Sequence, residues 1–326
     1  MITVWENDHQ KIIRRQISPG QRLGPGAIWI DLLAPSGEEL AFTQSLVGFH
    51  IPASPEKCEI EHSNRMRVEG GIFILSLPAV EMNGDGMQIG CDTFILSSKL
   101  LLTIRSIDSK AFSSFHEWIA SQPASITTPE QMFLEINEAL ISHTADALET
   151  TEKRLETLTN SILAGGPTQR GRLKELGGMR YVMHTLGQIG NLVMKIRYGV
   201  EWFEIILNFL KGEAQYRFNS DEMKRIDIAI RDLRSLADHT NFIEQQATFV
   251  LDAALGMISI EQNESLRWFT VISTVFMPPT LIASMYGMNF KYMPEIRWPL
   301  GYPMALTLII GSTIASALYF RRRGWI

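Results

Sequence analysis

Residues 268–286 read WFTVISTVFMPPTLIASMY, and residues 298–320 read WPLGYPMALTLIIGSTIASALYF. Neither stretch contains a charged residue. As helices, both are long enough to cross a hydrocarbon core of about 30 Å, because an α-helix rises about 1.5 Å per residue. One such run would also suit a buried helix of a soluble protein, but two runs separated by a short loop favour membrane spans. The sequence therefore predicts two transmembrane helices near the C-terminus.

The basic residues beside the two runs predict their orientation. Arg267 precedes the first run, and three arginines at positions 321–323 follow the second, whereas the loop between carries Lys291 and Arg297. Basic residues are retained on the cytoplasmic side of spans, so we expect both outer flanks in the cytoplasm and the loop outside. The N-terminus is polar and acidic and does not indicate a signal peptide. We therefore expect a protein of the plasma or bacterial inner membrane with a large cytoplasmic N-terminal part.

The composition argues against several other classes of protein. Hydrophobic residues make up 45% and charged residues 20%, which is ordinary for a folded chain. The net charge of −5 argues against a nucleic-acid binder that uses a large basic surface. Two cysteines, Cys58 and Cys91, are too few for a disulfide scaffold or a four-thiolate zinc site. No phosphate loop or nucleophile elbow is present, so we expect neither an enzyme nor an organic cofactor, and we interpret His143 and His184 as isolated.

The remainder of the chain changes from β-like to helical patterning. Short β-rich runs occupy residues 26–31, 71–78, 93–97 and 100–105, and the Asn-Gly-Asp-Gly sequence at 83–86 indicates a hairpin turn rather than a calcium loop. Helical spacing begins near Pro129, is interrupted at 165–167, and continues from about 168 to 212. A further helix begins at Asn219 or Ser220 and meets no proline before Pro278, which predicts more than sixty residues of helix.

The predicted fold class is α+β, with a cytoplasmic α/β head followed by long helices and two C-terminal membrane spans. Such a long helix needs partners along its length, so we expect self-association. The predicted segments are an α/β domain (1–125), a helical arm (126–218), a stalk helix (219–286) that continues into the first span (about 267–286), an outer loop (287–297), the second span (298–320) and a basic tail (321–326).

One face of the long helix carries an unusual stripe of side chains. Steps of three and four residues place these side chains on one line along the helix. Small hydroxyls, an amide and a methionine suit either close helix packing or a narrow, partly wet passage. Both interpretations remain open from periodicity alone. The stripe consists of Asn263, Leu266, Thr270, Ser273, Met277, Thr280 and Ser284.

A passage lined by this stripe would suit a hydrated hard cation. No carboxylate, histidine or cysteine lies between Glu264 and Glu295, whereas softer metals favour imidazole and thiolate ligands. Neutral oxygen atoms hydrogen-bond a water shell without removing it, which suits Mg²⁺ because that ion loses its water reluctantly. Two helices do not enclose a conduit, so several chains are needed. We interpret Pro278 and Pro279 as a kink rather than the end of the helix.

The loop after the first run reads Tyr286-Gly287-Met288-Asn289-Phe290, followed by Met-Pro-Glu-Ile at 293–296. This segment resembles the CorA family of divalent-cation channels, whose signature is Gly-Met-Asn at the outer end of the first span. The preceding Phe-Met-Pro-Pro at 276–279 and the basic C-terminus are also similar. The close resemblance covers about the last sixty residues, and the rest agrees in layout only.

The resemblance implies a homopentameric funnel in which the first span lines the pore. It implies a selectivity filter at Gly287, Met288 and Asn289, with the Asn289 amide oxygen accepting hydrogen bonds from the water around Mg²⁺. Glu295 would raise the cation concentration at the outer mouth. Further implied positions are an apolar constriction at Met277, with Leu266 and Phe269 deeper, and polar rings at Thr280 and Asn263.

The resemblance also implies closure of the pore by intracellular Mg²⁺ bound between neighbouring subunits. The stalk residue that would take part is Asp252, and Glu81 and Asp85 are weak candidates for its partner in the head. Cobalt and nickel transport stay open, because a site that reads hydrated ions discriminates poorly among similar divalent ions. Two alternatives remain. One is a zinc transporter of the ZntB type, although those relatives depart from Gly-Met-Asn at the methionine, and the other is a membrane-tethered scaffold.

Overall fold

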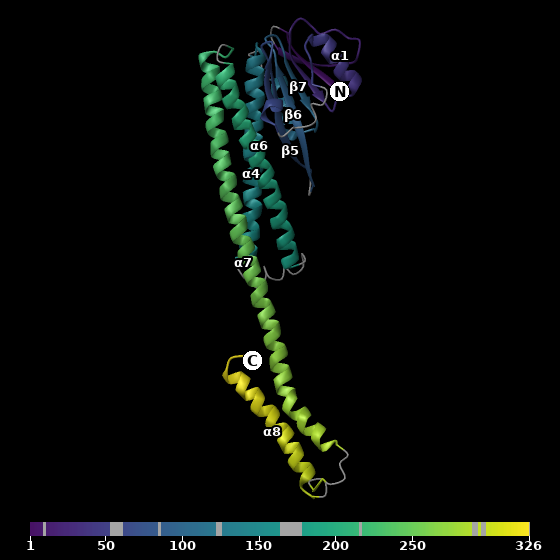
Figure 1. Ribbon diagram of the computed structural model, residues 1–326, viewed down its shortest axis with the longest axis vertical. Helices are drawn as coiled ribbons and strands as arrows, with labels where there is room; N and C mark the ends of the chain where they lie inside the picture. The colour runs from purple at the N-terminus through teal and green to yellow at the C-terminus, as the bar shows by residue number, and fades with distance from the viewer. Residues whose placement is uncertain are drawn as a thin grey trace. The chain divides into compact units, whose positions relative to one another are not determined.

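The computed structural model describes residues 1–8, 11–52, 61–83, 86–121, 126–163, 178–214, 217–288, 293–294 and 298–325. The chain divides into two compact units, Met1–Val250 and Leu251–Ile326. The first unit holds a sheet and several helices, and the second holds the last part of one long helix and a C-terminal helix (Figure 1).

The first unit is built on a seven-stranded sheet. Its strands are β1 (Ile2–Asp8), β2 (Lys11–Ile17), β3 (Ala27–Leu33), β4 (Met66–Glu69), β5 (Ile72–Asn83), β6 (Gly86–Leu96) and β7 (Leu101–Arg105). The strand order is β2-β1-β3-β7-β6-β5-β4. Only β3 and β7 pair in parallel among these strands, and every other neighbouring pair is antiparallel. The head is therefore built on a mixed sheet that is mainly antiparallel.

The predicted strands are confirmed as β3, β5, β6 and β7. The predicted hairpin is confirmed by the pairing of Asn83 with Gly86, although the tip at 84–85 lies outside the described residues. Strands β1, β2 and β4 were missed by sequence reasoning. In β2 most side chains are exposed, so Lys11, Arg14 and Arg15 hide the period-two pattern expected of a half-buried strand.

The two faces of the sheet have different cores. One face packs aliphatic side chains, among them Val4, Ile30 and Leu102, against helix α1 (Gly37–Val47). The other face carries stacked aromatic rings, including Trp5 and Trp29 with centroids 5.5 Å apart. It is covered by α3 (Lys110–Ser121), α4 (Pro129–Leu163) and α6 (Met179–Glu213), and the short α2 (His62–Arg65) precedes β4. The aromatic side chains of this face therefore lie between the sheet and the layer of helices.

The long helix α7 spans Ser220–Tyr286, and α8 spans Gly301–Arg322. Asn219 caps α7, because its Oδ1 accepts from the backbone N–H of Glu222 at 2.9 Å while the Glu222 carboxylate accepts from the N–H of Asn219. The helix starts where the sequence predicts and continues through Pro278 and Pro279. Helix α8 starts three residues later than the second predicted span, which leaves Trp298 before it.

Candidate functional site: the polar stripe of the C-terminal unit

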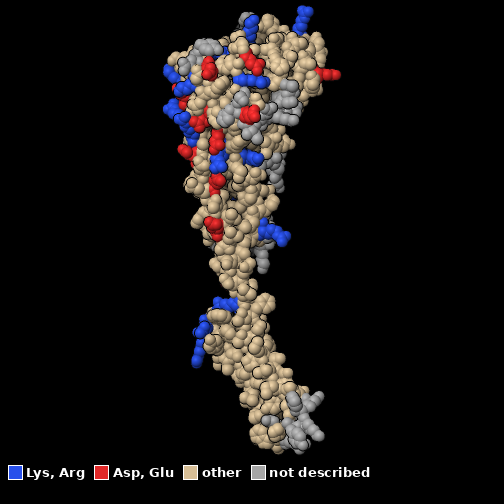
Figure 2. Space-filling view, in the orientation of Figure 1, with Lys and Arg blue, Asp and Glu red and all other residues tan. Residues whose placement is uncertain are grey.

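The two apolar helices of the C-terminal unit are not core helices of a soluble domain. In the most apolar window of α7 only 6% of the residues are buried within the chain, and the same share holds for α8. A soluble core helix would be mostly buried. Figure 2 shows this unit as a largely uncharged surface with basic side chains gathered at one end. The helices therefore expose apolar surface along their length, as membrane spans do.

The predicted pore residues all lie on α7 and are exposed on the single chain. Leu266 is 63% exposed, Phe269 70% and Met277 68%. The polar members of the stripe are exposed as well: Asn263, Thr270, Ser273, Thr280 and Ser284. A line that alternates small polar and large apolar side chains thus stays largely uncovered in one chain. Such a line is available for packing against further copies or for facing a shared axis.

Two hydroxyls of the stripe are oriented by the helix itself. Thr270 Oγ1 donates to the carbonyl of Leu266 at 2.8 Å, and Thr280 Oγ1 donates to the carbonyl of Phe276 at 2.7 Å. Because each hydroxyl donates its proton to its own helix, the lone pairs of the oxygen are what it offers outward. These positions therefore act as acceptors, which suits the donating water molecules around a cation.

The proline pair adds further acceptors at the level of Met277. Pro278 and Pro279 carry no N–H, so the carbonyls of Thr274 and Val275 receive no α-helical hydrogen bond from them. Within a membrane such carbonyls are tolerated only where protein or water meets them. The middle of the first span is therefore a place where backbone oxygen is free to meet water or a neighbouring chain.

The outer end of α7 brings backbone groups close together at Gly287. Its N–H donates to the carbonyls of Ala283 at 3.0 Å and Ser284 at 3.2 Å. A Cβ added to Gly287 would lie 3.3 Å from the Ala283 oxygen. The φ of Gly287 is not in the left-handed region. A Cβ at this position would require the helix terminus to shift by only a few tenths of an ångström, so the single chain does not by itself require glycine here. Met288 follows and is exposed, whereas Asn289 and Glu295 lie outside the described residues.

The inner ends of α7 and α8 are joined by a contact that sequence reasoning missed. The Arg267 guanidinium donates to the carbonyl of Gly324 and lies 5.4 Å from the centre of the Trp325 ring. Trp325 in turn packs on Phe320, with ring centroids 5.6 Å apart. The sequence holds a signal for this contact, because an arginine precedes one span and a tryptophan closely follows the other. This contact holds the C-terminal tail against the residue that precedes the first span.

The residues proposed for regulation lie in different surroundings. Asp252 is exposed on α7 in the C-terminal unit. Glu81, by contrast, is only 3% exposed, accepts from the backbone N–H of Lys110 at 3.2 Å, and lies 3.6 Å from His143 Nε2. His143 is therefore not isolated, which corrects the interpretation from sequence, whereas His184 is exposed on α6. Asp85 lies outside the described residues, and these residues contain no cluster of three metal-binding side chains.

Comparison with known proteins places this arrangement in a family. A family described as "CorA-like Mg2+ transporter protein" matches residues 25–322. The magnesium transport protein CorA of Escherichia coli K12 is 31% identical over 327 residues, with all of both chains covered. The complete structure of the CorA magnesium transporter from Methanocaldococcus jannaschii superposes with a TM-score of 0.74 at 20% identity, covering 100% of this chain and 99% of that one. The cytoplasmic domain of ZntB from Vibrio parahaemolyticus gives a TM-score of 0.57 at 12% identity over 79% of this chain and 97% of that one.

The fold, the two apolar helices and the family match thus define a class of two-span membrane transporters. The chain is a member of the CorA-like Mg²⁺ transporter family, as the Gly-Met-Asn segment predicted. The resemblance extends over the whole chain, whereas the sequence alone supported it closely only in the last sixty residues. The two apolar helices are membrane spans and the N-terminal unit is cytoplasmic.

Proposed function

We propose that this chain forms a homopentameric Mg²⁺ channel whose axis is lined by the polar stripe of α7. The observation that carries the proposal is the exposed row of acceptors and apolar side chains on α7, ending at the Gly-Met-Asn segment. Five copies would turn each position of the stripe into a ring. The family match and the CorA relatives support magnesium as the transported ion.

The chemistry of the rings suits a hydrated ion. Thr270 and Thr280 offer hydroxyl lone pairs, and Asn263 and Asn289 offer amide oxygens, so each ring accepts hydrogen bonds from water molecules bound to Mg²⁺. Because Mg²⁺ loses its water reluctantly, a filter that binds the water shell avoids the cost of dehydration. The exposed Met277 would form an apolar constriction between the polar rings, which resists passage when the pore is narrow.

Intracellular Mg²⁺ would hold the channel closed by bridging carboxylates of neighbouring subunits. Asp252 suits this role because it is exposed on α7. Glu81 suits it poorly, because it is buried and its Oε2 already accepts from Lys110 and faces His143. Loss of the bridging ion would leave like charges close together, and their repulsion would favour separation of the subunits.

Replacing Asp252 with alanine should weaken closure by internal Mg²⁺. Current through the channel in excised patches would be followed while internal Mg²⁺ is raised into the millimolar range. We expect the variant to need several-fold more Mg²⁺ for half-closure than the parent. Asp238→Ala removes another carboxylate of α7 and serves as the matched control. Equal Mg²⁺ dependence in parent and Asp252→Ala would rule out Asp252 as a sensor residue.

Ion flux into liposomes separates the magnesium channel from a zinc transporter of the ZntB type. Entry of Mg²⁺, Co²⁺, Ni²⁺ and Zn²⁺ would be compared with and without a proton gradient. We expect Mg²⁺ entry that follows the electrochemical gradient and does not respond to the proton gradient, with Co²⁺ and Ni²⁺ entering as well. Preferential Zn²⁺ entry that depends on the proton gradient would contradict the proposal.

A further inference from the structure

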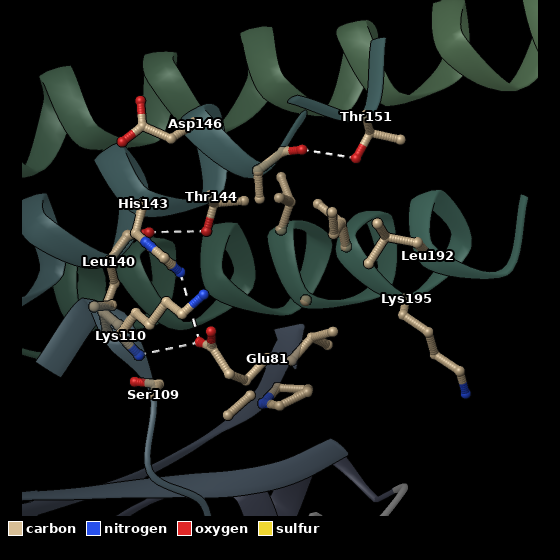
Figure 3. Close-up of a pocket in the computed structure, with 18 of the residues that line it drawn as sticks. Glu81, Ser109, Lys110, Leu140, His143, Thr144, Asp146, Thr151, Leu192 and Lys195 are labelled. Atoms are coloured by element: carbon tan, nitrogen blue, oxygen red, sulfur yellow. Dashed lines mark hydrogen bonds and ion pairs between the residues drawn. The ribbon is translucent and has the colours of Figure 1, made fainter. Parts of the chain in front are cut away.

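The cytoplasmic unit contains a cavity that has no part in the proposed pore. It has a volume of about 450 Å³ and lies between β5, the beginning of α3, and the helices α4 and α6 (Figure 3). Its lining includes the buried carboxyl groups of Glu81 and Asp92. The contacts of these two buried acids therefore indicate what kind of ligand the cavity could hold.

The walls of the cavity are mostly apolar, although Lys110, His143, Arg154 and Lys195 are also among the residues that line it. Leu192, Ile196 and Phe203 of α6 are buried along one side. Thr144 and Thr151 of α4 also line the cavity, but their hydroxyls donate to carbonyls of their own helix at 2.8 and 2.7 Å. Figure 3 shows both of these hydrogen bonds as dashed lines within α4. The threonines therefore add no donor to the space.

Asp92 is a buried acid with one carboxylate oxygen that has no hydrogen-bond partner among the described residues. It is 2% exposed, and its Oδ1 is buried without a partner. The neighbouring Arg105 on β7 attracts Asp92 electrostatically, but its Nε and Nη2 donate to Asp31 at 2.9 and 2.7 Å, and its buried Nη1 has no hydrogen-bond partner among the described residues. Burial raises the pKa of Asp92 to about 7, although Arg105 opposes the shift. An unpartnered buried carboxyl that lines a cavity points to a ligand that donates hydrogen bonds.

Glu81 provides the contrast within the same cavity. Its Oε2 accepts from the backbone N–H of Lys110 and faces His143 Nε2 at 3.6 Å, and both lie beside it in Figure 3. The N-terminus of α3 also favours a negative charge at this position. Glu81 thus has a hydrogen-bond donor within the protein, whereas Oδ1 of Asp92 has none among the described residues.

We propose that this cavity binds a small primary ammonium compound with an alkyl chain, whose ammonium group donates to Asp92. A primary ammonium has three N–H donors and a positive charge, which together satisfy and neutralise the buried carboxylate. The alkyl chain would pack on Leu192, Ile196 and Phe203, which exchanges apolar surface in water for apolar contacts. A carboxylate in place of the ammonium group would meet Asp92 as a like charge and would have no proton to donate to it.

Charged side chains of both signs also line the cavity. Lys110, Asp146 and Arg154 are exposed and His143 and Lys195 are half-buried, so water and salt screen their effect on an entering cation. The titratable and charged groups around Asp92 and the cavity are Asp31, Arg105, Glu81, Lys110, His143, Asp146, Arg154 and Lys195.

Calorimetric titration of the purified full-length protein with hexylammonium chloride at pH 8 tests the proposal. Hexanol and sodium hexanoate, which have the same chain length, are the ligand controls. We expect saturable binding of hexylammonium and at least tenfold weaker binding of both controls. Binding of hexanol as tight as that of hexylammonium, or no saturable binding of hexylammonium, would overturn the proposal.

Two matched variants locate the ammonium group. Asp92→Asn keeps the shape of the side chain and should weaken hexylammonium binding at least tenfold, whereas Glu81→Gln should change it less than threefold. The reverse order of effects, or equal affinity of Asp92→Asn and the parent, would contradict the assignment. Size-exclusion elution at the parent's position establishes that each variant is assembled.

The pH dependence gives a readout that a merely structural effect of Asp92→Asn would not produce. Hexylammonium keeps its charge between pH 6 and 8, while Asp92 loses its proton over this range. Binding to the parent should therefore tighten as the pH rises, and Asp92→Asn should lose this dependence. Persistence of the same pH dependence in Asp92→Asn would assign it to another group such as His143 and would contradict the proposed contact.

Discussion

Replacing Asn289 with alanine is expected to abolish Mg²⁺ uptake while the protein still assembles. In the proposed channel, Asn289 supplies the amide oxygens of the outer ring, and alanine has no acceptor in its side chain. The alanine methyl group would leave the water molecules around Mg²⁺ without hydrogen-bond acceptors at the pore entrance. The hydrated ion would then be more stable in bulk water than at the entrance. Uptake would be measured with a Mg²⁺-sensitive dye enclosed in liposomes.

A second asparagine in the chain provides the matched control. Asn208 is exposed on α6 and donates to the carbonyl of Glu204 in its own helix at 2.9 Å. Asn208→Ala removes the same amide from the cytoplasmic unit and should leave uptake within twofold of the parent. If Asn289→Ala conducts Mg²⁺ as the parent does, the proposed amide ring is wrong. Co-elution of the variant with the parent on size exclusion distinguishes loss of transport from loss of assembly.

Replacing Asp31 with asparagine should destabilise the cytoplasmic unit by about 3 kcal/mol, because removal of one partner of a buried ion pair leaves the other charge uncompensated. Asp31 and Arg105 are each 2% exposed and joined by two hydrogen bonds. His116 Nε2 lies 3.4 Å from the same carboxylate. Denaturant unfolding of the full-length protein would be followed by tryptophan fluorescence, since the stacked Trp5 and Trp29 rings lie beside His116.

The control for Asp31 is the exposed carboxylate on the same arginine. Asp108 lies 3.6 Å from Arg105 Nη1, and its side chain is 67% exposed, so Asp108→Asn should cost less than about 1 kcal/mol. An equal effect of the two variants would show that burial of the Asp31–Arg105 pair is not what makes it important. No change in Asp31→Asn would contradict the structure of this network.

The pH dependence of the Asp31 contribution follows from its lowered pKa. Burial acts to raise the pKa of Asp31, but the interactions with His116 and Arg105 outweigh burial and lower it to about 2 from an ordinary value of 3.8. The folded state therefore binds this proton less readily than the unfolded chain. The stabilisation is complete above about pH 4 and is lost as the pH falls toward 2. Asp31→Asn should lack this component of acid destabilisation.

The sequence predicts best the features that depend on local composition. The two spans follow from charge-free runs, and the start of α7 follows from Asn219 and the acidic residues after it. The stripe on α7 follows from a fixed helical period, although periodicity alone left pore lining and helix packing open. These features need no knowledge of distant contacts, which is why a single sequence is sufficient for them.

Features that depend on distant contacts were not predictable. Asp31 and Arg105 are 74 residues apart and meet only because β3 and β7 pair in parallel across the sheet. Asp92 joins this neighbourhood through the pairing of β6 with β7, and Glu81 of β5 meets His143 only because α4 packs on the same sheet. Likewise, the contact of Arg267 with Trp325 depends on the return of α8. No local sequence pattern predicts these contacts.

A structure of the assembled protein in a lipid bilayer with Mg²⁺ tests the central claim most directly. We predict copies arranged around one axis, with Asn263, Thr270 and Met277 facing it and the Asn289 amides surrounding a hydrated cation at the outer end. Finding the stripe turned toward lipid, or finding no opening along the axis of the assembly, would contradict the account.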